Sequence, residues 1–403
     1  MTLELNQVAS QVKAMGRSMK EQKPIRDEAV QQARTLLQDY STQFEQLQAR
    51  VQRAEIALQT QRFDWVGAAP VNEALAEAYP LPPSHKQVTV IASDGSQIMP
   101  DPHGILLYYL INTGCIIYRC GSNQKPEIYN PKPKLYYELD DLYDEQGRLI
   151  SPGEVTVKRD LAELEILTNI APAYARETGE PVVALMDGQL TLRVIDLPFD
   201  QQQAHQEIYV EMLDLLFKAG ALIAGYIDRP RSTFVLSLMR LASLELEAIT
   251  EENLRQNPFR HLTDFDLFSF LSPGERSALF SIKAKGLDIY RETGHGIHFF
   301  YLNVSQDASL PHLARVEIPA WLAADPCGLD ILHATIVQQA RVTGGYPYVL
   351  ARADELAVIT SQEREAVEMM LAVEMRHQGM RPEISFKRRN KNAYRYGKES
   401  FRL

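Results

Sequence analysis

Two apolar runs in this sequence end in the same dipeptide, Asp-Gly. One run leads into Asp94 and Gly95, and the other leads into Asp187 and Gly188. Runs so rich in valine and other apolar residues predict buried strands. A strand places its last side chain at a fixed position on the sheet edge, and a following glycine leaves room for a ligand. Two carboxylates presented in this way by neighbouring strands are able to share a hard cation such as Mg²⁺ or Mn²⁺.

The same dipeptide has a simpler explanation, because Asp-Gly is a common turn sequence. One such pair would be assigned to a turn by default. Two pairs, each after an apolar run in an alternating order of strands and helices, make a metal site as good an explanation as two turns. The sequence leaves both alternatives open at this point.

The segments around these runs alternate between strand-like and helix-like patterns, which predicts an α/β fold. The predicted order begins with three strands, a helix and a fourth strand. The predicted segments are strands at 87–95, 104–111 and 115–120 (the last two a hairpin turning at 112–114), a helix at 158–177, strands at 181–188, 191–196 and 221–228, helices at 205–219 and 231–248, a hairpin at 297–318, helices at 328–341, 347–353 and 361–377, and a short strand at 356–360.

The N-terminal 62 residues are predicted to form two helices separated by Pro24, since proline lacks the N–H that a helix interior needs. In the longer helix, residues 25–62, apolar residues recur at alternating spacings of four and three, which is a heptad stripe. The stripe consists of Ala33, Leu37, Tyr40, Phe44, Leu47, Val51, Ala54 and Leu58. A heptad stripe does not specify what it packs against. A helical hairpin on the chain's own domain and a coiled-coil-like dimer or partner arm are therefore both open.

The composition argues against several classes of protein. The formal net charge of −10 is unlike that of a passive nucleic-acid coat, which would be basic, but it is compatible with a nuclease whose carboxylates bind cations. Three cysteines without a C-x-x-C pair argue against a disulfide framework or a cysteine zinc site. No apolar run suits a transmembrane helix and no secretory signal begins the sequence, so we expect a cytoplasmic protein without membrane association.

The predicted helix between the two Asp-Gly pairs carries further acidic residues. Glu165 points roughly 160° away from Glu163, because a helix turns about 100° per residue. Only one of these glutamates can therefore face the sheet edge. Arg159 lies four positions before Glu163. The two residues form either a surface ion pair or a functional group in which Glu163 is a third metal ligand.

Taken together, these features resemble the ribonuclease-H-like nuclease plan and, more narrowly, the NurA family of DNA-end-processing nucleases. The resemblance rests on five short motifs, whose order and spacing are more specific than any one of them. They are IASDGSQI (91–98), R-x-x-x-E (159–163), ALMDGQL (184–190), AGYIDRPRST (224–233) and GYPYVLARADELAVIT (345–360). The resemblance extends over most of the chain.

The resemblance implies that Asp94, Glu163 and Asp187 hold divalent metal ions, Mn²⁺ or Mg²⁺, for two-metal phosphodiester hydrolysis. The last metal-binding position of the family follows a Tyr-Pro pair and is often histidine. This chain departs from that pattern, since Ala353 is followed by Asp354. A carboxylate binds the same ions, so Asp354 is the fourth expected metal ligand and catalytic residue.

Basic residues after a predicted strand are candidates for contacts with nucleic acid. Arg229 and Arg231 lie where the family is typically basic, and guanidinium groups clamp phosphate. Arg159 is a further candidate for phosphate binding. The alternative for the loop is a solvated arginine pair, with which Pro230 is consistent. Asp228 is interpreted as a possible strand-end partner for an arginine.

The C-terminal segment from residue 381 combines eight basic and two acidic residues with aromatic ones. Such a segment can stack bases and bind phosphates, but disordered tails of this kind are common and docking onto an acidic partner is a third alternative. The candidates for DNA binding here are Lys387, Arg388, Arg389, Tyr394 and Tyr396.

These predictions divide the chain into three parts. They are an N-terminal helical arm at 1–84, a NurA-like nuclease domain at 85–380 with insertions at about 121–157 and 250–290, and a basic aromatic tail at 381–403. The predicted fold class is α/β, a ribonuclease-H-like mixed sheet with flanking helices, preceded by the long-helix arm.

The expected function is that of a metal-dependent nuclease in DNA repair, with single-strand endonuclease and exonuclease activity on DNA ends, as the family implies. The family also implies a homodimer and a HerA-type hexameric translocase as a partner. Any ATP-driven step must come from that partner, because the chain has no P-loop. Two alternatives are a catalytically weak adaptor that binds the translocase and a different phosphotransfer or hydrolytic enzyme. Convergence of the three acids distinguishes the nuclease from the adaptor.

Overall fold

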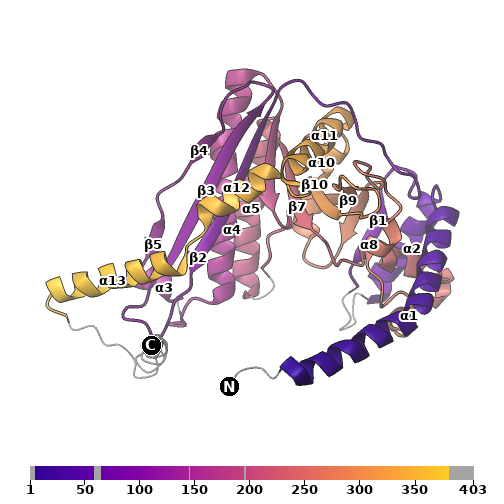
Figure 1. Ribbon diagram of the computed structural model, residues 1–403, viewed down its shortest axis with the longest axis horizontal. Coiled ribbons are helices and arrows are strands. Elements are labelled where there is room, and N and C mark those ends of the chain that lie inside the picture. Colours follow the sequence, from indigo (N-terminus) through magenta and orange to yellow (C-terminus); the bar gives the residue numbers. More distant parts are fainter. Residues whose placement is uncertain (1–4, 59–64, 145, 195–196, 381–403) are drawn as a thin grey trace. The chain divides into compact units, whose positions relative to one another are not determined.

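The computed structural model describes residues 5–58, 65–144, 146–194 and 197–380. Within them the chain is an α/β protein with ten strands and flanking helices (Figure 1). It divides into two compact units, which have different boundaries from the predicted arm, nuclease domain and tail; that division stays a prediction. Unit 1 comprises Met1–His85, Gly188–Leu190 and Ala224–Pro347, and unit 2 comprises Lys86–Asp187, Thr191–Ile223 and Tyr348–Leu403.

Unit 1 is built on an antiparallel sheet with the strand order β1-β8-β9-β10-β7. The predicted hairpin at 297–318 is confirmed as β9 and β10. The elements of unit 1 are α1 (Leu5–Asp39), α2 (Phe44–Leu58), β1 (Gly67–Pro70), β7 (Leu222–Asp228, whose first two residues belong to unit 2), α6 (Phe234–Ala242), η1 (Leu246–Ala248), α7 (Glu251–Arg255), α8 (Asp264–Phe268), β8 (Phe280–Lys283), α9 (Asp288–Glu292), β9 (Ile297–Asn303), β10 (Leu313–Pro319), α10 (Ala320–Ala323) and α11 (Pro326–Thr343).

The N-terminal helices break at a different place from the one predicted. α1 continues through Pro24, and the chain turns at residues 40–43 before α2 begins. The predicted break at Pro24 is wrong. A proline removes one N–H from a helix, and on an exposed helix the carbonyl four residues earlier is able to bond to water instead.

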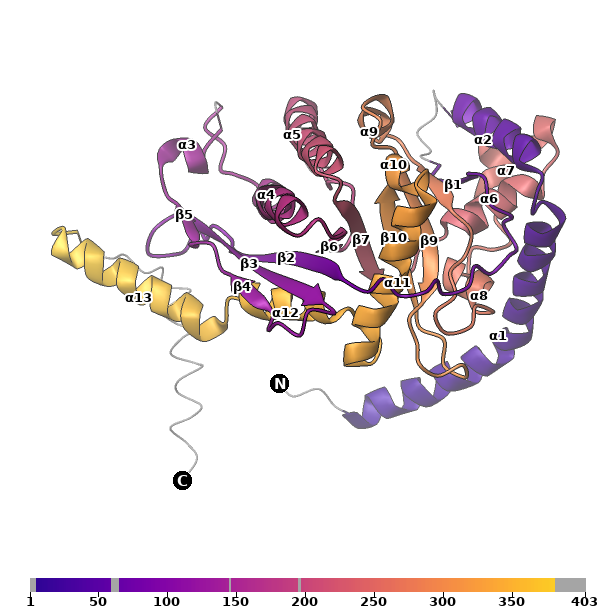
Figure 2. The ribbon, with the colours of Figure 1, turned by 90° about the horizontal axis from the view of Figure 1, so that it is seen from above.

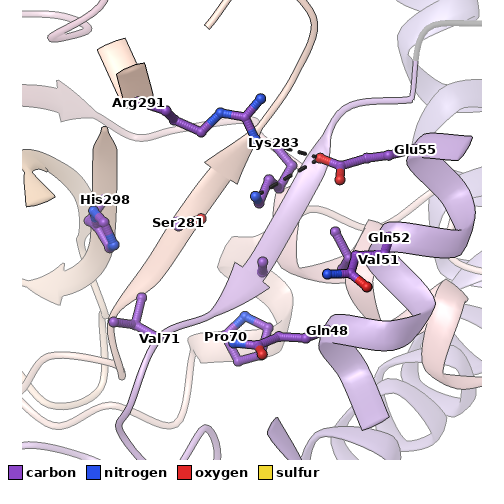
Figure 3. A pocket seen from close by; sticks show the side chains of 11 residues that line it. Gln48, Val51, Gln52, Glu55, Pro70, Val71, Ser281, Lys283, Arg291 and His298 are labelled. Atoms are coloured by element: carbon purple, nitrogen blue, oxygen red, sulfur yellow. Dashed lines mark ion pairs between the residues drawn. The ribbon is translucent and has the colours of Figure 1, made fainter. Parts of the chain in front are cut away.

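The heptad stripe packs within unit 1 from Ala33 to Ala54. α1 and α2 contact α6, α8 and β1, and Figure 3 shows the helix that carries Glu55 beside the strand that carries Pro70. This arrangement favours the helical hairpin over the partner arm for this part of the stripe. The exposed apolar residues Val12, Met15 and Met19 lie earlier on α1. The buried residues of the stripe include Ala33, Leu37, Leu47, Val51 and Ala54.

Unit 2 is built on a mixed sheet with the order β6-β2-β3-β4, and β5 also pairs with β3. β2 is antiparallel to β3 and parallel to β6. α4 and α5 lie on one side of this sheet and α12 on the other (Figure 2). The predicted fold class, a ribonuclease-H-like mixed sheet with flanking helices, is confirmed. The elements of unit 2 are β2 (Val88–Ile98), β3 (Tyr109–Cys120), β4 (Glu127–Tyr129), β5 (Lys134–Tyr136), α3 (Leu139–Leu142), α4 (Pro152–Thr178), β6 (Val182–Asp187), α5 (Phe199–Lys218), α12 (Tyr348–Ala357) and α13 (Ser361–His377).

β2 and β3 are longer than predicted. β2 extends to Ile98, so Asp94 and Gly95 lie inside the strand rather than at its end. β3 passes without a turn through residues 112–114, where a hairpin was predicted. The hairpin prediction is wrong because Gly114 allows α12 to pack closely on β3 and does not form a turn. A Cβ at this position would lie 2.6 Å from the Cβ of Leu356 on α12.

Two short strands predicted from apolar runs do not form. Residues 191–194, the described part of the predicted strand at 191–196, contain no strand. The predicted strand at 356–360 overlaps the end of α12 and a short connection to α13. Both predictions are wrong because a short apolar run can also be buried in a loop or at a helix end.

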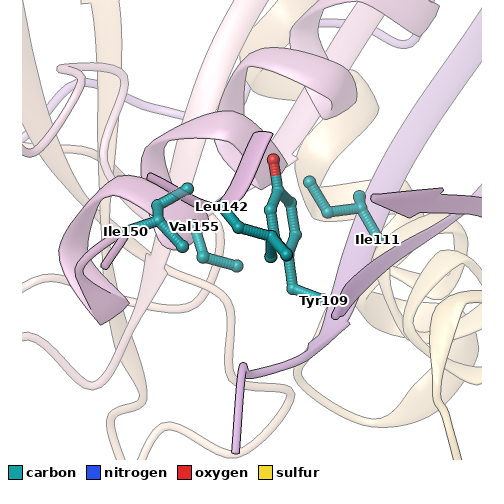
Figure 4. Packing of buried hydrophobic residues seen from close by; sticks show 5 residues of the cluster. All are labelled: Tyr109, Ile111, Leu142, Ile150 and Val155. Atoms are coloured by element: carbon teal, nitrogen blue, oxygen red, sulfur yellow. The ribbon is translucent and has the colours of Figure 1, made fainter. Parts of the chain in front are cut away.

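The predicted insertion at 121–157 is packed onto the edge of the unit 2 sheet. A buried apolar cluster joins β3 to α3 and to the start of α4, and this cluster anchors the segment that leads into α4 (Figure 4). Its members are Tyr109, Ile111, Leu142, Ile150 and Val155. None of the helices in the described part of the chain is long and apolar enough to cross a membrane.

Candidate metal centre

The register of β2 and β6 in unit 2 places Asp94 beside Asp187. The strands run parallel with Ser93 opposite Met186, so the next residue of each strand is Asp94 and Asp187. Asp94 is partly buried, and its Oδ1 accepts a 2.8 Å hydrogen bond from the backbone N–H of Gly95. Asp187 ends β6 and is exposed. The sheet therefore brings together two of the predicted ligands.

Of the two neighbouring glutamates on α4, Glu163 faces the sheet and Glu165 does not. Glu163 is only 4% exposed, whereas Glu165 is exposed, as the helical phase predicts. The hydroxyl of Ser93 donates a 2.9 Å hydrogen bond to the Glu163 carbonyl, which fixes this turn of α4 against β2. Gly95 permits the close approach, because a Cβ there would lie 2.7 Å from Glu163 Oε1. This glycine serves the packing of a helix on a strand and not a turn.

Asp354 comes from the opposite side of the sheet, on α12. The end of this helix is held by β2 and β3: the side chains of Ser96 and Asn112 both donate hydrogen bonds to the Ala357 carbonyl. The absent side chain of Gly114 allows α12 to lie directly on β3. Asp354 lies about one turn before Ala357 and is exposed. Its charge is close enough to raise the pKa of Asp94.

Burial and like charge oppose the ionisation of this cluster. Burial raises the pKa of Asp94 to about 6, and the charges of Asp187 and Asp354 act in the same direction. Burial also raises the pKa of Glu163 well above its ordinary value, with contributions from Asp94 and Asp187, while Arg159 opposes the shift. Glu163, Asp187 and Asp354 therefore all lie within electrostatic reach of Asp94, and a bound cation would reverse this unfavourable effect.

The Glu163 carboxylate is incompletely satisfied. Arg159 Nε lies 3.0 Å from Glu163 Oε1, which makes an ion pair. The N–H is not aligned with this oxygen, and Glu163 Oε1 accepts no hydrogen bond from any residue that the structure describes. The Arg159 guanidinium instead donates hydrogen bonds to Asp160 and Gln97. Buried carboxylate oxygens usually have a hydrogen-bond partner, so this oxygen is available to another ligand.

These residues fit a hard divalent cation in donor type and in charge, but they do not enclose one as they stand. Mg²⁺ and Mn²⁺ prefer oxygen donors, which all four acids supply. Among the described residues, no three His, Cys, Asp or Glu side chains lie in an arrangement that would hold a metal ion. Carboxylates without a counter-ion repel one another, and Glu163 is drawn towards Arg159. Side-chain movement is therefore required before the acids can share an ion.

The structure adds two residues that the sequence reasoning missed. Asp160 lies one turn before Glu163 on α4, its carboxylate binds Arg159, and burial raises its pKa. Gln97 accepts a hydrogen bond from the same arginine. The sequence did contain a signal for Asp160, because its three-residue spacing from Glu163 places both residues on one helical face. Nothing local in the sequence marks Gln97.

The predicted phosphate clamp lies in unit 1. Arg229 and Arg231 are exposed in the connection between β7 and α6, and Arg229 has a positive φ of 43°. Asp228 pairs with a histidine instead of the suggested arginine: its Oδ1 lies 2.5 Å from His312 Nε2. Phosphate binding by the two arginines stays a prediction. The predicted DNA-binding residues of the tail lie outside the described residues; they are Lys387, Arg388, Arg389, Tyr394 and Tyr396.

The fold and the site together define an α/β protein with a cluster of carboxylates on a ribonuclease-H-like mixed sheet. A family model described as the NurA domain matches residues 88–359. This match covers more than half of the chain, and the chain therefore belongs to the NurA family. It is a family of nucleases that generally depend on divalent metal ions.

Among solved structures, the chain is similar to Marinitoga piezophila Argonaute, whose crystal structure holds a 5′ OH guide RNA. The sequences are 11% identical, the match covers 69% of this chain and 31% of the Argonaute chain, and the TM-score is 0.29. A similarity this weak does not bear on function. No curated protein matches the chain.

Proposed function

We propose that this chain is a divalent-metal-dependent deoxyribonuclease that processes DNA ends, with Asp94, Glu163, Asp187 and Asp354 as the ligands for Mn²⁺ or Mg²⁺. The observation that carries this proposal is the parallel register that places Asp94 of β2 beside Asp187 of β6, with Glu163 of α4 and Asp354 of α12 within electrostatic reach of Asp94. Glu163 adds to it, because a buried glutamate with a purely structural role is expected to have both oxygens hydrogen-bonded, and one oxygen of Glu163 is not.

The chain's own residues position and neutralise the reacting groups. A bound pair of ions supplies Lewis-acid stabilisation of the phosphate and lowers the pKa of water at the site. Asp94 and Asp187 lie in fixed register on paired strands, and Ser93 holds the turn of α4 that carries Glu163. Arg159 is the basic group of this cluster, and its guanidinium is suited to a phosphate oxygen.

The finer activities follow from the family resemblance and are part of the proposal. They are single-strand endonuclease and exonuclease activity in DNA repair, cooperation with a HerA-type hexameric translocase, and a homodimeric state. Arg229, Arg231 and the basic tail are proposed to bind DNA. The exposed apolar residues at the start of α1 are compatible with a contact between chains.

The test is cleavage of end-labelled single-stranded and double-stranded DNA by purified protein, with Mn²⁺, with Mg²⁺ and with EDTA. The variant is Asp94→Asn, and the matched control is Asp330→Asn, which changes an exposed aspartate of α11. We expect metal-dependent cleavage that is lost in Asp94→Asn and kept in Asp330→Asn. Cleavage that survives in Asp94→Asn would contradict the assignment of the site.

A catalytically weak adaptor is the second candidate, and one observation favours it. The acids do not enclose a metal ion as they stand, and Glu163 is already paired with Arg159. An adaptor would bind no Mn²⁺ in isothermal titration calorimetry and would show no cleavage even with a HerA-type translocase present. Mn²⁺ binding that is lost in Asp94→Asn would exclude it.

A further inference from the structure

Unit 1 contains two adjoining cavities that are separate from the carboxylate residues described above. Their volumes are about 500 and 220 Å³, and Glu55, Lys283 and Arg291 line both. The larger is open to solvent and is lined by residues of α2, β1, β8, α9 and β9. Its volume lies in the range of about 300–1,000 Å³ that is typical of sites for small organic ligands.

The described lining of the larger pocket includes two cations, Lys283 and Arg291, and one carboxylate, Glu55, in a chain whose formal net charge is −10. Figure 3 shows the ends of Lys283 and Arg291 directed towards the Glu55 carboxylate. Their nitrogens lie 3.9 and 4.0 Å from Glu55 Oε1, at the outer limit of an ion pair. Lys285 lines the smaller cavity together with Asp288, which binds Arg291. Among the described residues, Lys283 and Arg291 therefore share the Glu55 carboxylate at long distances.

An aromatic side chain borders the same charges. Trp65 lines the smaller cavity beside Lys283 and Arg291. Its indole lies close to the start of β1, since a Cβ at Gly67 would lie 2.4 Å from the Cζ2 atom of Trp65. Any larger residue at position 67 would displace the indole. An indole beside a lysine and an arginine is the combination that binds a base and its phosphate.

We propose that these cavities bind a nucleotide unit, with Lys283 and Arg291 on its phosphate and Trp65 against its base. The guanidinium and the ammonium suit a phosphate oxygen, and Glu55 is displaced from them when the anion binds. The unit is either a free mononucleotide or part of a single strand. This site extends the proposed nuclease function, but its binding chemistry does not depend on cleavage.

The test uses the fluorescence of Trp65 in the full chain. The sequence has two tryptophans, Trp65 and Trp321, so Trp321→Phe leaves Trp65 as the reporter. Asp94→Asn and EDTA remove the proposed cleavage, and circular dichroism checks that the variant is folded. The probes are thymidine 5′-monophosphate, a thymidine oligonucleotide, and thymidine without phosphate. We expect quenching by one or both phosphorylated probes, and none by thymidine at the same concentration.

Two variants with opposite expected effects on the affinity make the test specific. Changing both Lys283→Gln and Arg291→Gln removes the phosphate contacts and is expected to weaken binding by at least about tenfold, or about 1.4 kcal/mol. Glu55→Gln removes a competing carboxylate and is expected to strengthen it several-fold. The matched control changes Lys218→Gln and Arg255→Gln, which carry the same charges in ion pairs elsewhere and should leave the affinity unchanged.

Three outcomes would overturn the proposal. They are absence of quenching by both phosphorylated probes at millimolar concentration, equal quenching by thymidine, and an affinity unchanged by both the double substitution and Glu55→Gln. Quenching by the oligonucleotide alone assigns the site to a strand, and quenching by both probes assigns it to a mononucleotide unit. Failure of DNA cleavage in the separate nuclease assay would leave these results standing, so the two proposals are tested independently.

Discussion

Each unit buries a glutamate beside an arginine, and the two carboxylates differ in how fully they are satisfied. In unit 1, Glu317 binds Arg315 at 2.8 Å through one oxygen and accepts a 2.8 Å hydrogen bond from the Leu190 N–H through the other. In unit 2, Glu163 has an ion pair with Arg159 and an oxygen without a hydrogen bond from the described residues.

The comparison shows that burial and pairing do not distinguish a structural carboxylate from a functional one. Burial raises the pKa of both Glu317 and Glu163. The two glutamates differ in their neighbours. Other acids, Asp94 and Asp187 among them, add to the rise in the pKa of Glu163. A carboxylate with partners on both oxygens stabilises the fold, whereas an incompletely satisfied carboxylate among other acids is suited to bind a cation.

The largest expected effect is the loss of activity in Glu163→Gln. We expect cleavage to slow by at least about 100-fold. Loss of a residue that only supports a metal ligand already costs up to about that factor, and Glu163 is itself a proposed ligand. The free energy of unfolding in EDTA should change little or increase, because a poorly bonded buried charge is removed. Single-turnover cleavage and urea unfolding measure the two quantities. Glu165→Gln is the control on the exposed face of the same helix and should change neither; activity close to that of the parent in Glu163→Gln would refute the comparison.

The converse change, Glu317→Gln, should act on stability. In the amide an NH₂ donor replaces one of the two oxygens that face Arg315 and the Leu190 N–H. The negative charge is also lost, so the buried guanidinium has no counter-ion. We expect the free energy of unfolding to fall by about 3–5 kcal/mol, measured by urea denaturation in EDTA. Glu251→Gln, in the exposed pair with Arg255, should have a much smaller effect. Equal losses in the two variants would show that the buried pair is not a structural one.

Two glycines extend the comparison to the backbone. A Cβ at Gly225 would lie 2.6 Å from the Gly188 carbonyl oxygen and 2.8 Å from the Leu190 nitrogen, and neither backbone atom can rotate away. Gly225→Ala should therefore destabilise the fold by about 1–3 kcal/mol. At Gly95 the nearest atoms belong to the side chains of Glu163 and Arg159. Gly95→Ala should cost less stability and lower the affinity for Mn²⁺ more, as thermal unfolding and calorimetry would show. The opposite ranking would mean that Gly95 has no special part in the metal centre.

The smallest effect is a dependence on pH. Because the pKa of Asp94 rises from 3.8 to about 6 on folding, the protonated form stabilises the metal-free protein at low pH. That contribution is lost as the pH rises from about 4 to about 6, and Asp94→Asn should flatten this part of the stability profile.

The affinity for metal depends on pH in the opposite direction from stability, since a cation requires the ionised carboxylate. The affinity for Mn²⁺ should increase by up to about tenfold per pH unit below about pH 6 through Asp94, and the raised pKa of Glu163 extends the increase to higher pH. Calorimetry across this range measures it. A metal affinity that does not change with pH would mean that Asp94 is not a ligand.

Some parts of this fold follow directly from local sequence patterns. The strands that carry Asp94 and Asp187 follow from their apolar runs, and the orientation of Glu163 rather than Glu165 towards the sheet follows from the helical repeat. These properties depend on residues that are neighbours along the chain, so the sequence alone is sufficient to predict them.

Other parts depend on contacts between distant residues. Gly114 was predicted to lie in a turn, and a turn was one of two alternatives for Gly95, but both glycines lie inside strands, with Leu356 and Glu163 packed against them. A glycine that permits a turn and one that permits a close approach are identical in the sequence, and only the packed neighbour distinguishes them.

The sequence by itself determined the NurA family, the α/β class and the acidic residue types of the candidate site. Only the tertiary structure decided which acids come within reach of one another, which of them lacks a hydrogen bond, and that Asp160 and Gln97 share Arg159. The physical reason is that strand propensity and helical phase are set by neighbours in the sequence, whereas strand register, helix docking and desolvation arise when segments far apart in the sequence pack together.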